Sequence, residues 1–174
     1  MMKKKALTMT ALACTFVLGS WAQNPEPQSP QFKYIERSWD DSQKQIVETE
    51  KTLTGSDYTM LSGSDDWVRL GVPENPTEEQ INKDYYYAVA GIVSYKVLNV
   101  YGRVHIILCN NAQLTCTGSV LVAHGHNNAK LFIYGQKDVE GQNPGKLIVN
   151  NTEYNSTAGI GSSEEQKCGE ITIH

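Results

Sequence analysis

The sequence predicts an all-β protein: a short parallel β-helix of about two to three turns, preceded by a β-hairpin and a long irregular segment. Two observations lead to this fold class. Short segments of alternating apolar and polar residues, separated by Asn, Gly and Thr, fill the chain from residue 84 onward. Three kinds of segment follow one another and then recur in the same order. A parallel β-helix requires that succession, because each strand stacks on its equivalent one turn later.

The recurring strands are expected to share one core. The first kind is residues 104–109, with counterparts at 131–134 and 171–174; the second is 114–116, matched by 146–149; the third is 120–122, matched by 158–160. Alternation turns one apolar set toward a common interior: Val104, Ile106, Leu108, Leu114, Cys116, Val120, Val122, Leu131, Ile133, Leu147, Val149, Ile160, Ile171 and Ile173. Four apolar residues fall out of phase and should point outward, either under the N-terminal segment or as an exposed patch: Ile107, Leu121, Phe132 and Ile148.

Residues 32–83 are expected to form a hairpin followed by a loop and cap segment. Residues 32–39 and 45–53 alternate weakly on either side of a polar turn. Residues 54–83 contain scattered Gly, Pro and acidic residues, so we interpret them as a long surface excursion. A capping box that begins at Thr77 predicts one short helix within it.

The first 22 residues predict a bacterial signal peptide. A Lys-rich start precedes an apolar stretch that ends at Leu18, and Ala22 closes a small-x-small cleavage pattern. The apolar stretch is shorter than the roughly 20 residues that span a bilayer. We therefore expect a secreted, periplasmic or cell-surface protein with a flexible, Pro-rich leader at residues 23–31. Cys14 leaves an alternative open, because the residues before it loosely resemble a lipoprotein box.

The charge balance argues against a nucleic-acid partner. The chain has 15 Lys+Arg and 19 Asp+Glu, and the predicted signal peptide holds three of the lysines and no acidic residue. A chain without excess positive charge gains little from phosphate contacts. No second long apolar run occurs, so no membrane span is expected.

Three cysteines remain after the signal peptide: Cys109, Cys116 and Cys168. At most one intramolecular disulfide could join them, and no pair has the CxxC spacing of a zinc or redox site. We interpret them as small buried apolar residues, which is the commoner role of strand-borne cysteines. The spacing alone leaves their disulfide state open.

Four strings carry a family resemblance: IILC at residues 106–109, FIYGQ at 132–136, AGIG at 158–161 and ITIH at 171–174. They resemble repeat-rich secreted proteins of gut bacteria that often carry the label carbohydrate-binding domain-containing protein. The resemblance implies a right-handed parallel β-helix with a pectate-lyase-like fold, covering residues 84–174. Members of that family usually continue past the last string into further turns, so the resemblance also suggests a domain truncated at its C-terminus.

The predicted β-helix is poor in catalytic groups. Residues 103–135 contain no Asp or Glu, although glycosidases use two carboxyl groups about 5–10 Å apart. No Ser-His-Asp signature, phosphate-binding loop or zinc-protease motif occurs, and no cofactor is implied. The sequence therefore favours a non-catalytic module. A minimal or degenerate polysaccharide lyase or hydrolase stays as the alternative.

Two weak candidates for metal binding can be named. Asp65 and Asp66 could hold Ca²⁺, or a sugar together with Trp67, but they lack the alternating oxygen ligands of a calcium loop. His124 and His126 could share a metal ion at a corner between strands, although no third ligand is close in sequence.

Aromatic side chains are the candidates for glycan binding, because some tyrosines in strands must face outward and an exposed ring can stack on a sugar. The candidates are Trp67, Tyr86, Tyr95, Tyr101 and Tyr134. We thus predict an exported module that binds a glycan or a surface protein at the bacterial envelope. A third interpretation is a structural protein that self-associates through the open C-terminal end of the β-helix.

Overall fold

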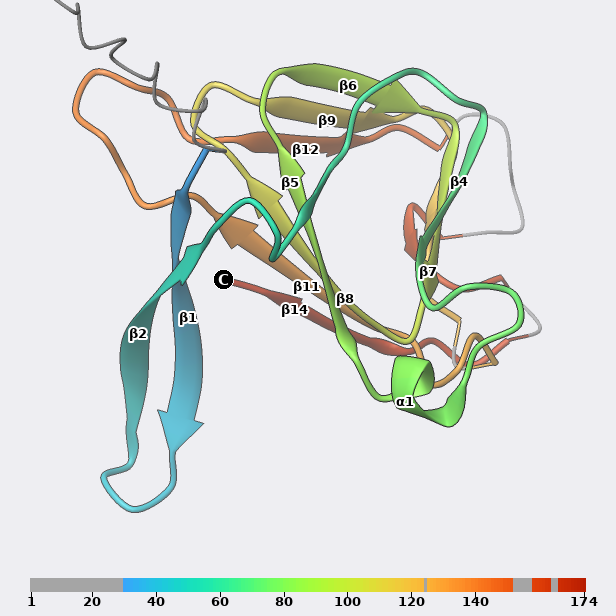
Figure 1. The fold of residues 1–174 in the computed structure, drawn as a ribbon, viewed down its shortest axis with the longest axis horizontal. Helices are drawn as coiled ribbons and strands as arrows, with labels where there is room; N and C mark the ends of the chain where they lie inside the picture. The colour runs from blue at the N-terminus through green and yellow to red at the C-terminus, as the bar shows by residue number, and fades with distance from the viewer. Residues whose placement is uncertain (1–29, 124, 152–157, 164–165) are drawn as a thin grey trace, which may run out of the picture.

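The computed structural model describes residues 30–123, 125–151, 158–163 and 166–174 (Figure 1). The predicted signal peptide at residues 1–22 lies outside the described residues. The described part is all-β and dominated by parallel sheets, and its one short helix is α1 (Glu78–Ile81). Thr77 caps that helix in the predicted capping box, since its hydroxyl accepts from the backbone N–H of Gln80.

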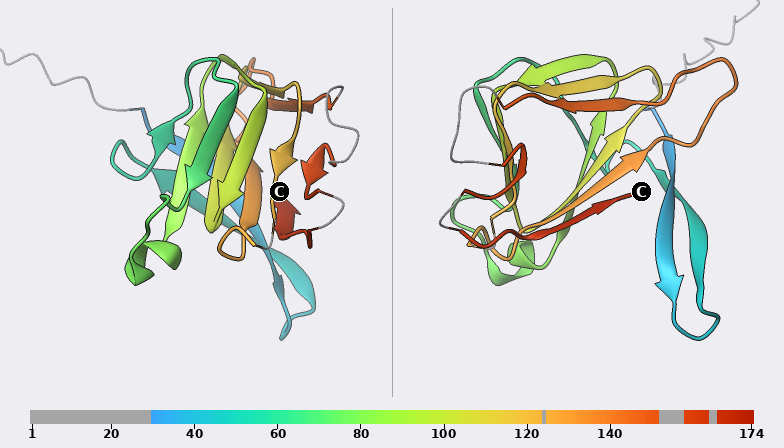
Figure 2. Two further views of the ribbon diagram at one scale, coloured as in Figure 1. Left: turned by 90° about the vertical axis from the view of Figure 1, so that its right-hand side faces the viewer. Right: turned by 180° about the vertical axis from the view of Figure 1, so that it is seen from behind.

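An antiparallel hairpin comes first, as the sequence predicts. It consists of β1 (Phe32–Asp40) and β2 (Gln45–Leu53), paired from Phe32 opposite Leu53 to Asp40 opposite Gln45. The Asp40 carboxylate accepts hydrogen bonds from the backbone N–H groups of Ser42 and Gln43, which closes the turn. The base of the hairpin packs on the body, whereas its tip projects away from it (Figures 1 and 2).

Three parallel sheets make up the body. The five-stranded sheet contains β3 (Thr59–Met60), β5 (Asp84–Val89), β8 (Arg103–Leu108), β11 (Lys130–Gly135) and β14 (Glu170–Ile173). The four-stranded sheet contains β4 (Trp67–Gly71), β7 (Val97–Tyr101), β10 (Val120–Leu121) and β13 (Ile160–Gly161). The three-stranded sheet contains β6 (Ile92–Tyr95), β9 (Gln113–Cys116) and β12 (Lys146–Val149).

From β5 onward the chain visits the five-, three- and four-stranded sheets in turn, so the sheets surround one interior (Figure 1). Val104 on β8 pairs with Leu131 on β11, and Leu131 pairs with Ile171 on β14. Leu114 pairs with Leu147 in the three-stranded sheet. The predicted succession of strands is therefore confirmed, and so are the strands that pair, although Val120 pairs with Ile160, two residues beyond the predicted match at Ala158.

The corners between strands use the backbone geometry that Asn allows. Asn111, Asn127 and Asn128 have φ values of 62°, 54° and 52°, in the left-handed region that Asn tolerates better than most residues. Asn111 also ties two corners together, because its side-chain oxygen accepts from the backbone N–H of Asn143 at 2.9 Å.

The expectation for residues 54–83 was wrong in part. These residues are not only a surface excursion, because β3 and β4 lie within them and begin two of the parallel sheets. Val68 and Leu70 on β4 pair with Leu98 and Val100 on β7. The flanking acidic residues, glycines and prolines hide this short alternating pattern in the sequence.

One burial expectation is met and another needs correction. Ile107 lies on the outer face of β8 but is fully buried, together with Phe32 and Tyr34 from the base of the hairpin. The N-terminal segment therefore covers this out-of-phase residue, whereas Ile148 remains exposed. Ile173 was expected in the core and is 68% exposed, because β14 is the last strand of its sheet among the described residues.

Candidate functional site

A row of stacked rings crosses the outer face of the five-stranded sheet. His105 on β8 is in register with Tyr86 on β5 and with Phe132 on β11. The Tyr86 and His105 ring centroids are 4.4 Å apart, and those of His105 and Phe132 are 4.5 Å apart. Neighbouring strands are separated by nearly the same distance, roughly 4.8 Å, so the sheet itself brings these rings face to face.

The central ring of this row is fixed by hydrogen bonds on both nitrogens. His105 Nε2 lies 3.1 Å from Asp84 Oδ1, and His105 Nδ1 lies 3.1 Å from the hydroxyl of Tyr134. A carboxylate only accepts, so Nε2 donates to Asp84 and Nδ1 accepts from Tyr134. Burial lowers the pKa of His105 and keeps the imidazole neutral, although the hydrogen bond to Asp84 acts in the opposite direction.

The base of the hairpin closes over one part of this face. The Tyr34 ring packs on Tyr134 with 4.6 Å between the centroids, and the Tyr34 hydroxyl is hydrogen-bonded to Tyr86. Burial raises the pKa of Tyr34, so this hydroxyl stays protonated and can donate. The contacts of Tyr34 place β1 and β2 beside the outer edge of the ring row.

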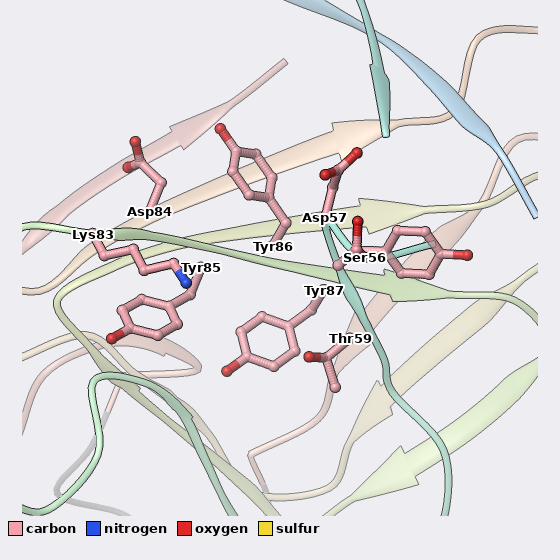
Figure 3. Close-up of a pocket in the computed structure, with 9 residues that line it drawn as sticks. Ser56, Asp57, Thr59, Lys83, Asp84, Tyr85, Tyr86 and Tyr87 are labelled. Atoms are coloured by element: carbon pink, nitrogen blue, oxygen red, sulfur yellow. The ribbon is translucent and has the colours of Figure 1, made fainter. Parts of the chain in front are cut away.

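A cleft of about 440 Å³ opens between β2, the loop after it and the start of β5. Tyr34, Lys51, Asp57, Lys83, Asp84 and Tyr86 line it. A smaller hollow of about 120 Å³ shares Asp57, Lys83, Asp84 and Tyr86 with the cleft and adds Tyr85 and Tyr87 (Figure 3). In Figure 3, Asp84 and Tyr86 point to one side of β5, and Tyr85 and Tyr87 point to the other.

Two carboxylates in the cleft are held in position by protein groups. Asp57 Oδ2 accepts from the backbone N–H and from the hydroxyl of Thr54, both at 2.7 Å, and these bonds lower the pKa of Asp57. Asp84 Oδ1 binds His105 and, at 2.8 Å, the Nε of Arg103. Among the described residues, no group hydrogen-bonds the second oxygen of either carboxylate.

The sequence did not single out Asp57 or Asp84 as site residues. The two are separated by irregular chain and meet only because residues 56–57 lie against the start of β5. One signal could have identified Asp84: it directly precedes Tyr85, Tyr86 and Tyr87, so an acid stands at the head of an aromatic strand.

Among the predicted aromatic residues, Tyr86 is the one that lines this cleft. Tyr95 and Tyr134 are buried, at 3% and 1% exposure, and the Tyr95 hydroxyl donates to the backbone carbonyl of Ser62. Their rings belong to the packing of the body and offer no free face to a ligand.

Tyr101 is covered as well. The Arg69 guanidinium lies 3.5 Å from its ring centroid, and the His126 ring stacks on it at 4.1 Å. Arg69 comes from β4 and His126 follows β10, the two strands that flank β7, so the contacts fall on opposite faces of the tyrosine.

Within the described residues, the predicted metal candidates Asp65 and Asp66 do not belong to a set of metal ligands. Trp67 is 57% exposed on β4, and the backbone carbonyls of Asp65 and Asp66 accept from Lys96 and Val97, which anchors this loop beside β7. His124 lies outside the described residues, so its predicted pairing with His126 is untested. The described residues contain no group of three or more His, Cys, Asp or Glu side chains that could hold a metal ion.

Cys109 and Cys116 agree with the interpretation of the cysteines as buried apolar residues, whereas for Cys168 that interpretation was wrong, because it is exposed. Cys109 and Cys116 are buried free thiols, and burial raises their pKa values to about 11 and about 12. Cys168 is a free thiol on the surface. A thiolate at neutral pH is therefore disfavoured at both buried positions.

A scan against protein-family models found no match to this chain, and searches of curated proteins and of solved structures found none either. No helix within the described ranges is long and apolar enough to cross a membrane. The cleft beside Tyr86 and the strand pattern are the features of this chain that bear on its function.

Proposed function

We propose that this protein is an exported, non-catalytic parallel β-helix module that binds glycans through the cleft beside Tyr86. The strand order supports the β-helix, because successive strands pass through three parallel sheets in a fixed rotation. The Lys-rich, apolar N-terminus supports export to the bacterial envelope. The resemblance of its strand motifs to secreted gut-bacterial repeat proteins supports both.

The position of Tyr86 at the end of the ring row is the observation that carries the glycan-binding proposal. His105 covers the side of Tyr86 that faces β8. On the other side of β5, β3 is only two residues long and pairs with Tyr87 and Ala88, so the cleft takes the place of a neighbouring strand beside Tyr86. An aromatic ring at the wall of a polar cleft suits a sugar, whose C–H face packs on the ring while its hydroxyls reach polar groups.

The presence of Asp57 and Asp84 in one cleft favours a second candidate, a minimal glycoside hydrolase. Such an enzyme needs one carboxyl group whose raised pKa keeps it protonated as the acid. The hydrogen bonds from Thr54 lower the pKa of Asp57, and Asp84 is tied to Arg103. A lowered pKa does not suit Asp57 as the proton donor, and Arg103 and His105 occupy one oxygen of Asp84, so the contacts favour binding over hydrolysis.

Self-association is a third candidate, favoured by an apolar groove of about 670 Å³ at β12, β13 and β14. Leu147, Val149, Ile160 and Ile173 line it. Each of these strands is the last of its sheet in the described part of the chain. An edge of this kind can pair with a further strand. Sedimentation at several concentrations tests the idea, and a monomer throughout argues against it.

A glycan array tests the proposed function. The purified protein should bind at least one glycan, Tyr86→Ala should abolish that signal, and Tyr86→Phe should retain most of it because the ring stays. Trp39→Ala is the matched control, since Trp39 is 58% exposed on the projecting hairpin. Absence of binding by the wild type, or equal binding by Tyr86→Ala, would contradict the proposal. Unchanged reducing ends after incubation with the bound glycan would exclude the hydrolase.

A further inference from the structure

The lysines and the carboxylates of the cleft differ in how far they are free to bind a ligand. Lys51 Nζ lies 3.6 Å from a carboxylate oxygen of Glu36, and Lys83 Nζ lies 5.8 Å from the centroid of the Tyr85 ring. Both ammonium groups thus have a partner within the protein. Asp57 and Asp84, by contrast, each keep one oxygen without a hydrogen bond from any described group. The cleft is therefore richer in free acceptors than in free donors.

The acceptors are also fixed in place. Thr54 binds Asp57 through two hydrogen bonds that lower its pKa, so this carboxylate stays ionised even in mildly acidic surroundings. Arg103 and His105 hold the other carboxylate, at Asp84. Rigid carboxylate oxygens bind hydroxyl donors well and repel a second anion.

We infer that the ligand is a neutral oligosaccharide, with one sugar ring against Tyr86 and its hydroxyl groups donating to Asp57 and Asp84. This inference rests on the proposed function and specifies its ligand class. A uronic acid or a sulfated sugar would bring its negative charge toward two carboxylates whose neighbouring lysines already have partners. The cleft volume of about 440 Å³ falls within the range of roughly 300–1,000 Å³ that is usual for small-ligand sites.

Asp57→Asn is the variant that removes the negative charge of Asp57 without removing its hydrogen bonds. The asparagine side-chain oxygen can still accept from Thr54, so the loop keeps its hydrogen bonds while the negative charge disappears. Asp41→Asn is the matched control, because Asp41 is exposed in the hairpin turn and does not line the cleft. Asp84 is left unchanged, since Arg103 and His105 depend on it.

The experiment measures dissociation constants of the full chain for neutral, uronic-acid, sulfated and amino-sugar oligosaccharides. We expect binding of a neutral oligosaccharide and weaker binding of every anionic probe. The affinity for the neutral oligosaccharide should fall about 10-fold in Asp57→Asn and should not fall in Asp41→Asn.

Tighter binding of an anionic or amino-sugar probe would overturn the assignment of the ligand as a neutral oligosaccharide. If that binding still depended on Tyr86, the proposed function would stand. Unchanged neutral binding in Asp57→Asn would overturn the role of Asp57, and failure of all four probe classes would overturn both proposals.

Discussion

The Nδ1 atom of His174 accepts a hydrogen bond from the backbone N–H of Arg37 at 3.2 Å, which joins the end of the described chain to the N-terminal hairpin. The same imidazole stacks on Tyr134 with 4.6 Å between the ring centroids. Tyr134 in turn contacts Tyr34, a wall of the cleft. The contact at His174 is therefore connected to the site through two rings.

This contact should weaken in acid. Burial lowers the pKa of His174 below the usual histidine value of about 6.5, with Glu36 opposing the shift and Arg37 adding to it. A histidine of this kind binds protons more readily when the contact is open, so its stabilising effect is present above about pH 6.5 and is lost as the pH falls toward the lowered value. The Arg37 amide signal in NMR spectra should therefore shift between about pH 8 and pH 5.

His174→Phe is the control for that titration. It keeps an aromatic ring against Tyr134 but has no acceptor and no titrating group. The Arg37 amide of this variant should already resemble the low-pH wild type and should not change with pH. A wild-type amide that is insensitive to pH would show that His174 does not hold the hairpin.

Removing the central ring of the row should destabilise the body. His105→Ala takes away the stack between Tyr86 and Phe132 and leaves the buried Tyr134 hydroxyl without its acceptor. We expect a loss of about 2–4 kcal/mol in the free energy of unfolding, measured by urea denaturation. Ser38→Ala, at an exposed position on the hairpin, should change it by less than about 0.5 kcal/mol. Equal midpoints for the two variants would argue that the ring row contributes little.

A pair of glycine substitutions tests how closely the parallel strands approach. A Cβ at Gly169 would lie 2.0 Å from the carbonyl oxygen of Ala129, whereas a Cβ at Gly135 would meet nothing within 4 Å. Gly169→Ala should therefore lower stability by about 1–3 kcal/mol, a fall in melting temperature of several degrees, and Gly135→Ala should be nearly neutral. A Gly169→Ala variant as stable as the wild type would contradict the placement of β14 beside β11.

The three thiols in the described part of the chain should differ in reactivity. Cys168 is exposed, whereas burial holds the pKa values of Cys109 and Cys116 at about 11 and about 12. A maleimide at neutral pH should label Cys168 first and the other two only after denaturation, as read by peptide mapping. Cys168→Ser should remove the fast phase. Rapid labelling of Cys116 in the folded protein would mean that the interior is accessible to the reagent.

Sequence pattern was enough to predict the pairing of β8 with β11 and of β11 with β14. Alternation with a period of two residues assigns Val104, Leu131 and Ile171 to one face, and the structure pairs these residues with one another. The same reasoning missed β3 and β4, because a strand of two residues has no measurable period and the five residues of β4 stand among turn-forming residues.

The candidate site was less predictable, since it depends on how separate segments dock. Tyr34, Asp57 and Tyr86 belong to the hairpin, a loop and a strand, and no local pattern relates them. Ring exposure depends on neighbours as well: Tyr101 is covered only because Arg69 and His126 flank it. The sequence could identify aromatic residues as candidates, but it could not predict which aromatic ring keeps one face exposed.

The most direct test is a crystal structure of the protein with the neutral oligosaccharide that binds most tightly in the probe series. We expect a sugar ring against Tyr86, on the side opposite His105, with hydroxyl groups within hydrogen-bond distance of Asp57 and Asp84. A sugar bound instead at the exposed Trp67 or Trp39, with the cleft free of ligand, would contradict the assignment of this cleft as the glycan site.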